Sequence, residues 1–147
     1  MENITQVQNT GLKKIKLDFK ESKYSTGRRK KSIARIWIKK GTGKIYVNNK
    51  NMNDYFKRPN HRNLLIRPLE ISERISEYDV RCNVRGGGLS GQVGAIIHGI
   101  SKALLLYEPD LKGSLKKESL TTRDSRAVER KKYGRRKARR SFQFSKR

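Results

Sequence analysis

The last 25 residues of the chain, 123–147, restrict what it can fold into more than any other segment. They contain twelve Lys or Arg residues and two acids, and Ala127 and Val128 are their only aliphatic pair. A segment of this kind buries too little apolar surface to offset the conformational entropy that it loses on ordering. We therefore predict that 123–147 is an extended basic tail outside any hydrophobic core.

The rest of the chain is basic as well, which indicates a polyanionic partner. The formal net charge is +24 on 147 residues, from 37 Lys and Arg against 13 Asp and Glu. Such a charge makes a free compact protein repel itself. The sequence has no apolar run of about 18 residues, which is the length needed to span a bilayer. Its charged stretches also lack the periodicity of a membrane-surface helix. Nucleic acid is the predicted partner, and a membrane is not.

Residues 23–122 have the patterning of one small domain with both strands and helices, and residues 1–22 are predicted to be a mixed polar N-terminal extension. Apolar residues alternate over 32–38, glycines follow at 41 and 43, and 44–47 is again apolar, which predicts a β-hairpin. A further strand is predicted over 78–85, with Cys82 on its packed face. Arg81 and Arg85 lie on its polar face.

Helices are predicted in four places, the last being a short helix that Asp110 can cap and that carries Leu111 and Leu115. A short helical segment near residues 54–56 ends at Pro59, and two more, 64–66 and 69–71, are separated by Pro68. The longest helix carries apolar residues at helical spacing from 93 to 107, with Ser90 as its cap. Gly94, Ala95 and Gly99 keep part of this helix thin, so we expect another backbone to approach it closely.

A glycine motif, Gly86-x-Gly88-x-x-Gly91, precedes this long helix and admits two interpretations. It satisfies the dinucleotide-binding pattern, with Glu108 and Asp110 about 20 residues later, but Glu108 stands beside Pro109 instead of at the end of a second parallel strand. The alternative is that exposed N–H groups at the helix N-terminus contact RNA phosphate. We favour the second interpretation.

The sequence offers little for catalysis. His61 and His98 are far apart in the chain, Cys82 alternates into an apolar face, and no spacing of His, Cys and Asp resembles a metal site. We predict no enzyme activity, no cofactor, no metal and no small-molecule substrate.

The positive signal is the density of Lys and Arg, because such charge is costly unless phosphates neutralise it. Three aromatic residues of the tail, Tyr133, Phe142 and Phe144, are candidates for stacking on bases. The predicted RNA-binding residues are Arg28, Arg29, Lys30, Lys31, Arg35, Arg81, Arg85, Gly86, Gly87, Gly88, Arg123, Arg126, Arg130, Lys131, Lys132, Arg135, Arg136, Lys137, Arg139 and Arg140.

Several of these segments, in this order, resemble one family. They are Thr26-Gly27-Arg28-Arg29-Lys30, the run from Val84 to Gln92, Thr122-Arg123-Asp124-Ser125-Arg126, the run from Glu129 to Gly134, and the final stretches Lys137 to Arg140 and Lys146-Arg147. Together they are similar to the ninth small-subunit ribosomal protein of bacterial and organellar type. Ser141-Phe142 departs from the basic residue and proline that the family commonly has there.

The resemblance implies a fold and a role. The fold is α+β, with a small mixed sheet, helices packed on one face, a left-handed βαβ crossover of the ribosomal protein domain-2-like kind, and a long extended C-terminal tail. The role is that of a structural constituent of the small ribosomal subunit, bound to ribosomal RNA and neighbouring proteins in the head. Arg130–Arg140 would cross ribosomal RNA, and Lys146 and Arg147 would contact transfer RNA in the peptidyl site.

Two points stay open at the level of sequence. A free, non-specific nucleic-acid chaperone would use the same charge, so it is the alternative function. The many Lys, Ile and Asn residues indicate an A+T-rich genome, and with the resemblance they favour a mitochondrial ribosome. A bacterial cytoplasm or a plastid is the alternative location.

Overall fold

A five-stranded mixed sheet forms the centre of the computed structural model, which describes residues 21–145. Its strand order is β1-β2-β5-β3-β4, with β3 and β5 parallel and the other neighbours antiparallel. The strands are β1 (Lys23–Arg29), β2 (Ser32–Lys40), β3 (Ile45–Val47), β4 (Lys50–Asn51) and β5 (Tyr78–Arg85). The predicted α+β class and mixed sheet are confirmed.

The predicted hairpin of 32–38 with 44–47 is wrong, although both strands exist. β5 lies between β2 and β3, so that Cys82 faces Ile36 on one side and Val47 on the other. The glycine-containing turn after β2 is fastened to β5 instead, because the backbone N–H groups of Thr42 and Lys44 each donate to Asp79 Oδ1 at 2.9 Å. Alternation reveals which face a strand buries, but it does not reveal the strand's partner.

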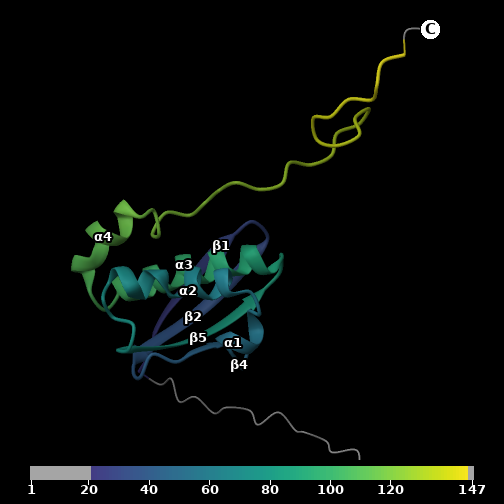
Figure 1. Cartoon of the computed structure of the whole chain (residues 1–147). Helices are drawn as coiled ribbons and strands as arrows, with labels where there is room; N and C mark the ends of the chain where they lie inside the picture. Colours follow the sequence, from purple (N-terminus) through teal and green to yellow (C-terminus); the bar gives the residue numbers. More distant parts are fainter. Residues whose placement is uncertain (1–20, 146–147) are drawn as a thin grey trace, which may run out of the picture.

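The parallel strands β3 and β5 are joined by a helical connection, as the resemblance predicts, and the left-handed sense of this crossover stays a prediction. The helices are α1 (Met52–Tyr55), α2 (Pro59–Ile71), α3 (Leu89–Leu105) and α4 (Lys112–Lys117), with a 3-10 turn, η1 (Pro109–Leu111), before α4. Helices α2 and α3 lie together on one face of the sheet (Figure 1).

Both prolines of the α2 region behave differently from the prediction. Pro59 begins α2 instead of ending a helix. Proline is tolerated in the first turn because the N–H group that it lacks would have no hydrogen-bond partner within the helix there. Pro68 lies inside α2 and does not divide it. Leu65, Pro68 and Leu69 are all buried, so packing of this face against α3 offsets the hydrogen bond that Pro68 cannot make.

The thin part of α3 packs directly against β1, as predicted. A Cβ atom added to Gly27 would lie 1.9 Å from the carbonyl oxygen of Ala95 and 2.5 Å from the backbone nitrogen of Gly99. Ser25 donates its hydroxyl to the carbonyl oxygen of Gly99 at 2.6 Å. The strand and the helix therefore touch through their backbones, which only small residues allow.

The hydrophobic core lies between the sheet and these two helices. It contains the packed face of β5 and the α3 residues Val93, Ile96, Ile100 and Leu104, all predicted to be apolar contacts. Cys82 is fully buried and donates its thiol to the carbonyl oxygen of Tyr46 at 3.2 Å. Burial raises the pKa of this thiol, in keeping with its predicted place in the core.

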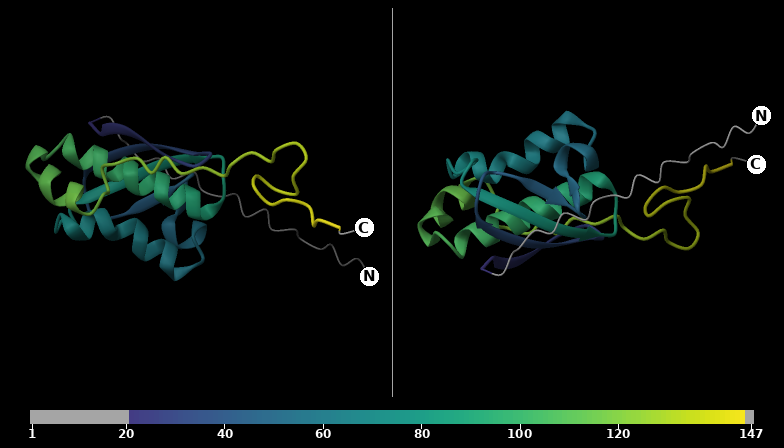
Figure 2. Two further views of the ribbon diagram at one scale, coloured as in Figure 1. Left: turned by 90° about the horizontal axis from the view of Figure 1, so that it is seen from above. Right: turned by 90° about the horizontal axis from the view of Figure 1, so that it is seen from below.

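The C-terminal tail runs back over the helical layer before it leaves the domain. Seen from above, it passes from α4 across α3 and then projects beyond the domain (Figure 2). Thr122, Asp124 and Arg126 line one hollow with the middle of α3, and Ala127 and Val128 line another at the N-terminus of α3.

Candidate nucleic-acid interface

The glycine turn between β5 and α3 fixes one end of the candidate interface. Gly86 and Gly87 adopt positive φ angles of +75° and +61°, which side chains disfavour. The carbonyl oxygen of Gly86 accepts hydrogen bonds from the Ser32 hydroxyl at 3.0 Å and from the Gln92 amide at 3.2 Å. The turn is thereby held against the connection between β1 and β2.

Helix α3 begins at this turn without a side-chain cap. Gly88 occupies the N-cap position and makes no side-chain hydrogen bond, so the N-terminal backbone of the helix offers donors and a positive dipole end. Ser90, predicted to be the cap, lies within the helix, and its hydroxyl is 3.3 Å from His61 Nε2. The prediction of a Ser90 cap is wrong because the helix starts one residue earlier than Ser90.

A hollow of about 640 Å³ opens at this end of α3, and we call it the α3 hollow. It brings together the turn after β1, the start of α2, the start of α3 and the root of the tail. None of its lining residues is acidic. They are Lys30, Lys31, Arg58, His61, Gly87, Gly88, Leu89, Ser90, Gly91, Ala127 and Val128.

Two residues of the α3 hollow were missed in the sequence. Arg58 is the N-cap of α2, so a second helix N-terminus reaches the same hollow. His61 is only 9% exposed, and its Nδ1 atom has no hydrogen-bond partner among the described residues. The Arg58-Pro59 pair was a usable signal, because proline favours the first position of a helix and places the preceding residue at its cap.

A second hollow, of about 410 Å³, follows α3 and contains the anchor of the tail. Asp124 pairs with Arg29 of β1 at 3.0 Å and with Arg126 of the tail at 2.9 Å. The hydrogen bonds from Arg126, first from its side chain and then from its backbone, lower the pKa of Asp124 well below the usual range. Arg29 lies against Gly94, because a Cβ atom added to Gly94 would be 2.2 Å from the Cδ atom of Arg29.

Beyond this anchor the tail folds into a loop instead of running straight. Gly134 has a positive φ of +70°, and the backbone N–H of Arg136 donates to the carbonyl oxygen of Arg140 at 2.8 Å. Glu129 pairs with Lys132 at 2.8 Å and with Arg139 at 2.9 Å, and these hydrogen bonds lower its pKa. The tail is therefore partly shaped by its few acids.

The predicted site residues fall into separate groups. Lys30, Lys31, Gly87 and Gly88 line the α3 hollow; Arg28 and Arg29 line the second hollow. Arg35, Arg81 and Arg85 lie on the face of the sheet opposite the helices. The predicted stacking residues Tyr133, Phe142 and Phe144 are largely exposed on the tail. Lys146 and Arg147 lie outside the described residues.

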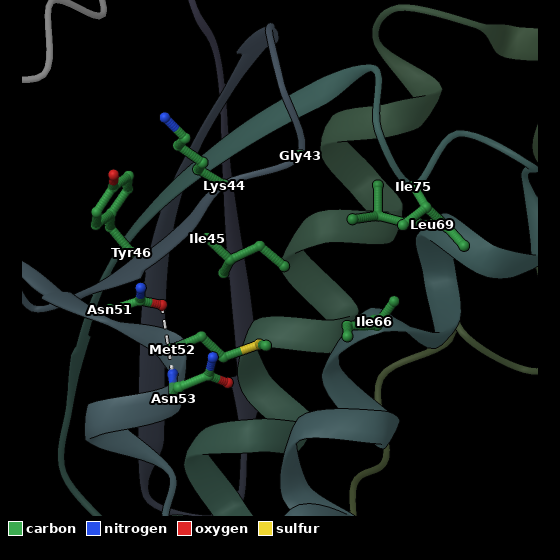
Figure 3. A pocket seen from close by; sticks show the side chains of 10 residues that line it. All are labelled: Gly43, Lys44, Ile45, Tyr46, Asn51, Met52, Asn53, Ile66, Leu69 and Ile75. Atoms are coloured by element: carbon green, nitrogen blue, oxygen red, sulfur yellow. Dashed lines mark hydrogen bonds between the residues drawn. The ribbon is translucent and has the colours of Figure 1, made fainter.

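The remaining hollows and motifs offer less for chemistry. A hollow of about 320 Å³ beside β3 is lined mainly by apolar side chains such as Ile45, Ile66 and Leu69, while the Lys44 ammonium group points away from them (Figure 3). Within residues 21–145, no group of three or more His, Cys, Asp or Glu side chains is placed to hold a metal. No helix of the described chain is long and apolar enough to cross a membrane.

Glu108, the acid of the dinucleotide interpretation, serves the fold instead. Its carboxylate accepts the Tyr78 hydroxyl at 2.7 Å and pairs with Arg74 at 3.4 Å. Burial, with the hydrogen bond to Glu108, raises the pKa of Tyr78 to about 12. β5, which precedes the glycine turn, also has an antiparallel neighbour on one side. This is not the parallel arrangement of a dinucleotide-binding unit.

An α+β domain with one acid-free cationic hollow and a basic tail is typical of a nucleic-acid-binding protein of structural type. The sequence then specifies which one. The family described as Ribosomal protein S9/S16 matches residues 27–147, so the chain belongs to that family. The predicted resemblance and a ribosomal role are confirmed, within a class of proteins that is structural and non-enzymatic and that has ribosomal RNA and other ribosomal proteins as partners.

Proposed function

We propose that the chain is a structural constituent of the small ribosomal subunit, that it binds ribosomal RNA in the head, and that its tail contacts transfer RNA in the peptidyl site. The observation that carries this proposal is the family match, which spans residues 27–147 and so includes the tail. The alternative, a free non-specific nucleic-acid chaperone, has no comparable support.

The α3 hollow is the proposed phosphate site of the domain. Two uncapped helix N-termini, those of α2 and α3, meet there with Lys30, Lys31 and Arg58. Glycines at 87 and 88 leave the backbone open to close approach by a ligand, and helix N-termini favour anions. A phosphate backbone at this place would neutralise cations that have no acid beside them in the hollow.

The tail is proposed to divide into two parts with different RNA partners. Arg130–Arg140 would cross ribosomal RNA, helped by stacking of Tyr133, Phe142 and Phe144, which have little core to join. Lys146 and Arg147 would contact the transfer RNA. We also propose the division of the chain into an extension (1–22), a domain (23–122) and the tail (123–147).

Deletion of Lys146 and Arg147 tests the proposed division of the tail into a part that crosses ribosomal RNA and a tip that contacts transfer RNA. We expect small subunits that carry the shortened chain to assemble normally and to lose transfer RNA from the peptidyl site faster. A matched control replaces both residues by Gln, which keeps the length and removes the charge. Defective assembly with normal retention of transfer RNA would contradict the proposed division.

The proposed location is the mitochondrial ribosome. Ribosome-associated location follows from the family, and the Lys, Ile and Asn content of the chain supports an organelle with an A+T-rich genome. Fractionation of the source cells, followed by detection of the chain in purified mitochondrial small subunits, tests this proposal. Detection only in cytoplasmic or plastid ribosomes would overturn it.

A further inference from the structure

The face of the sheet that α2 and α3 do not cover carries one row of large side chains. Residues opposite each other in neighbouring strands share a face. Tyr24 of β1 faces Trp37 of β2, Trp37 faces Arg81 of β5, and Arg81 faces Tyr46 of β3. The row therefore crosses four strands, and we call this side of the sheet the open face.

Trp37 lies between Tyr24 and Arg81 in this row and is close to both, with the Tyr24 and Trp37 rings tilted by 46° to each other. The rings of Tyr24 and Trp37 have centroids 5.3 Å apart. The Arg35 guanidinium lies 5.7 Å from the Tyr24 ring and 5.3 Å from the Trp37 ring, and the Arg81 guanidinium lies 5.9 Å from the Trp37 ring. Arg35 Nε also donates to the Tyr24 hydroxyl at 3.3 Å. These planar groups are held in place before any partner arrives.

The open face is also strongly cationic. Arg85 stands beside Ile33 in the register, so it continues the charge of Arg35 and Arg81 along the sheet. Its acid, Asp79, already accepts the backbone N–H groups of Thr42 and Lys44. In the described part of the chain, none of these three arginines forms an ion pair, and Arg81 Nε has no hydrogen-bond partner.

We propose that the open face binds an unpaired segment of RNA, whose bases stack on Trp37 and Tyr24 while its phosphates pair with the surrounding arginines. This inference rests on the proposed function and adds a second RNA surface, opposite the α3 hollow. A sheet face presents stacking groups in one plane, as single strands require, whereas a duplex hides its base planes. A protein partner would need acidic side chains to pair with these guanidinium groups, which it would otherwise bury without a counter-charge.

Trp37 is the only tryptophan of the chain, so its fluorescence reports on the open face alone. The full-length chain is titrated with a single-stranded RNA oligonucleotide and, separately, with inorganic polyphosphate of the same charge. Stacking of a base on the indole should quench its emission in a saturable way with RNA. Polyphosphate, which has no bases, should bind without this quenching.

The variant Arg35→Lys separates stacking from charge, because it keeps the cation and removes the planar guanidinium. We expect it to weaken the RNA-dependent quenching several-fold. Arg67→Lys is the matched control, since Arg67 lies on α2 and pairs with Glu118 instead. Thermal unfolding of both variants tests whether the fold is intact.

The possible results separate this inference from the proposed function. Salt-dependent RNA binding without any change in Trp37 emission, or equal quenching by polyphosphate, would overturn the open-face proposal and leave the proposed function in place. Absence of RNA binding would count against both. In purified small subunits, ultraviolet cross-links from the peptide of Trp37 should lead to nucleotides; cross-links to another protein would mean that a protein occupies this face.

Discussion

The domain and the tail are both strongly basic, but different forces give them their shape. The domain is held by a buried apolar core, so its cations stand at fixed positions on strands and helix ends. The tail has no such core, and its course depends on Asp124, which ties it to Arg29, and on Glu129, which closes its loop. Exposed ion pairs contribute little stability. The domain is therefore organised by its own core, whereas we expect the tail to depend on bound RNA for most of its order.

The largest expected effect comes from removal of the tail. Truncation after Glu129 deletes ten Lys or Arg residues. We expect the affinity for small-subunit RNA to fall by about 100-fold or more. The slope of log K against log salt concentration should become shallower by roughly 0.7 for each phosphate that the shortened chain no longer neutralises. Fluorescence anisotropy with labelled RNA at several salt concentrations measures both.

The same truncation should leave the domain's unfolding temperature unchanged, because Leu120 is the last of the described residues to pack against the core. A clear loss of thermal stability would break the distinction between a self-supporting domain and a dependent tail. It would mean that the tail packs on the domain more strongly than its exposed side chains indicate.

A second prediction concerns the backbone contact between β1 and α3. Replacement Gly27→Ala places a methyl group against the backbone of Ala95 and Gly99, neither of which can move without shifting the helix. We expect a loss of about 3 kcal/mol in the free energy of unfolding. Urea denaturation of the full-length chain measures this loss.

Gly113→Ala is the matched control for this substitution. Nothing lies within 4 Å of a Cβ at Gly113, which belongs to the helix α4. Alanine should therefore stabilise the chain slightly, by roughly 0.5 to 1 kcal/mol. Equal effects of the two substitutions would show that the close approach of β1 and α3 does not govern the stability of the domain.

The sequence predicted the faces of the elements better than their neighbours. The alternation over 32–38 and 78–85 correctly identified buried residues such as Ile36 and Cys82. It did not show that β5 enters between β2 and β3, because that pairing depends on residues far apart in the chain. The cationic clusters, like the strands, could be predicted because their residues are continuous in sequence.

The site was predictable only where its residues are neighbours in sequence. Lys30 and Lys31 and the glycine turn were found in this way. Arg58 and His61 reach the α3 hollow only because α2 starts beside α3, and that was hidden by the mistaken end of a helix at Pro59. The row of the open face was hidden too, because its members come from four strands that are not consecutive.

The third prediction tests the anchor of the tail. Asp124→Asn removes the ion pair with Arg29, so we expect amide hydrogen exchange over residues 121–128 to become several-fold faster, without a change in the domain's unfolding temperature. Glu118→Gln, which removes a surface ion pair with Arg67 instead, is the control and should leave this exchange unchanged. Unchanged exchange in the Asp124→Asn variant would show that other interactions hold the tail.

The smallest expected effect is a pH dependence at the place where domain and tail meet. His98 lies in the second hollow, and its Nδ1 accepts the backbone N–H of Arg28 at 3.3 Å. Burial, followed by the charge of Lys102, lowers the pKa of His98 below its ordinary value of 6.5. Arg123 lowers it further.

A base whose pKa is lowered by folding stabilises the folded state at pH values above its ordinary pKa. Between 6.5 and the lower folded pKa, the unfolded chain binds the proton more readily, so stability falls as the pH is lowered through this window. The substitution His98→Gln removes the titrating group and should flatten the dependence, measured as unfolding temperature from pH 7.5 to pH 5. Asp124, whose pKa is lowered by Arg126, stays charged throughout that range. The anchor of the tail should therefore persist while the domain loses the contribution of His98. Identical pH profiles of the unfolding temperature in the original chain and in the His98→Gln variant would assign the pH dependence to another group.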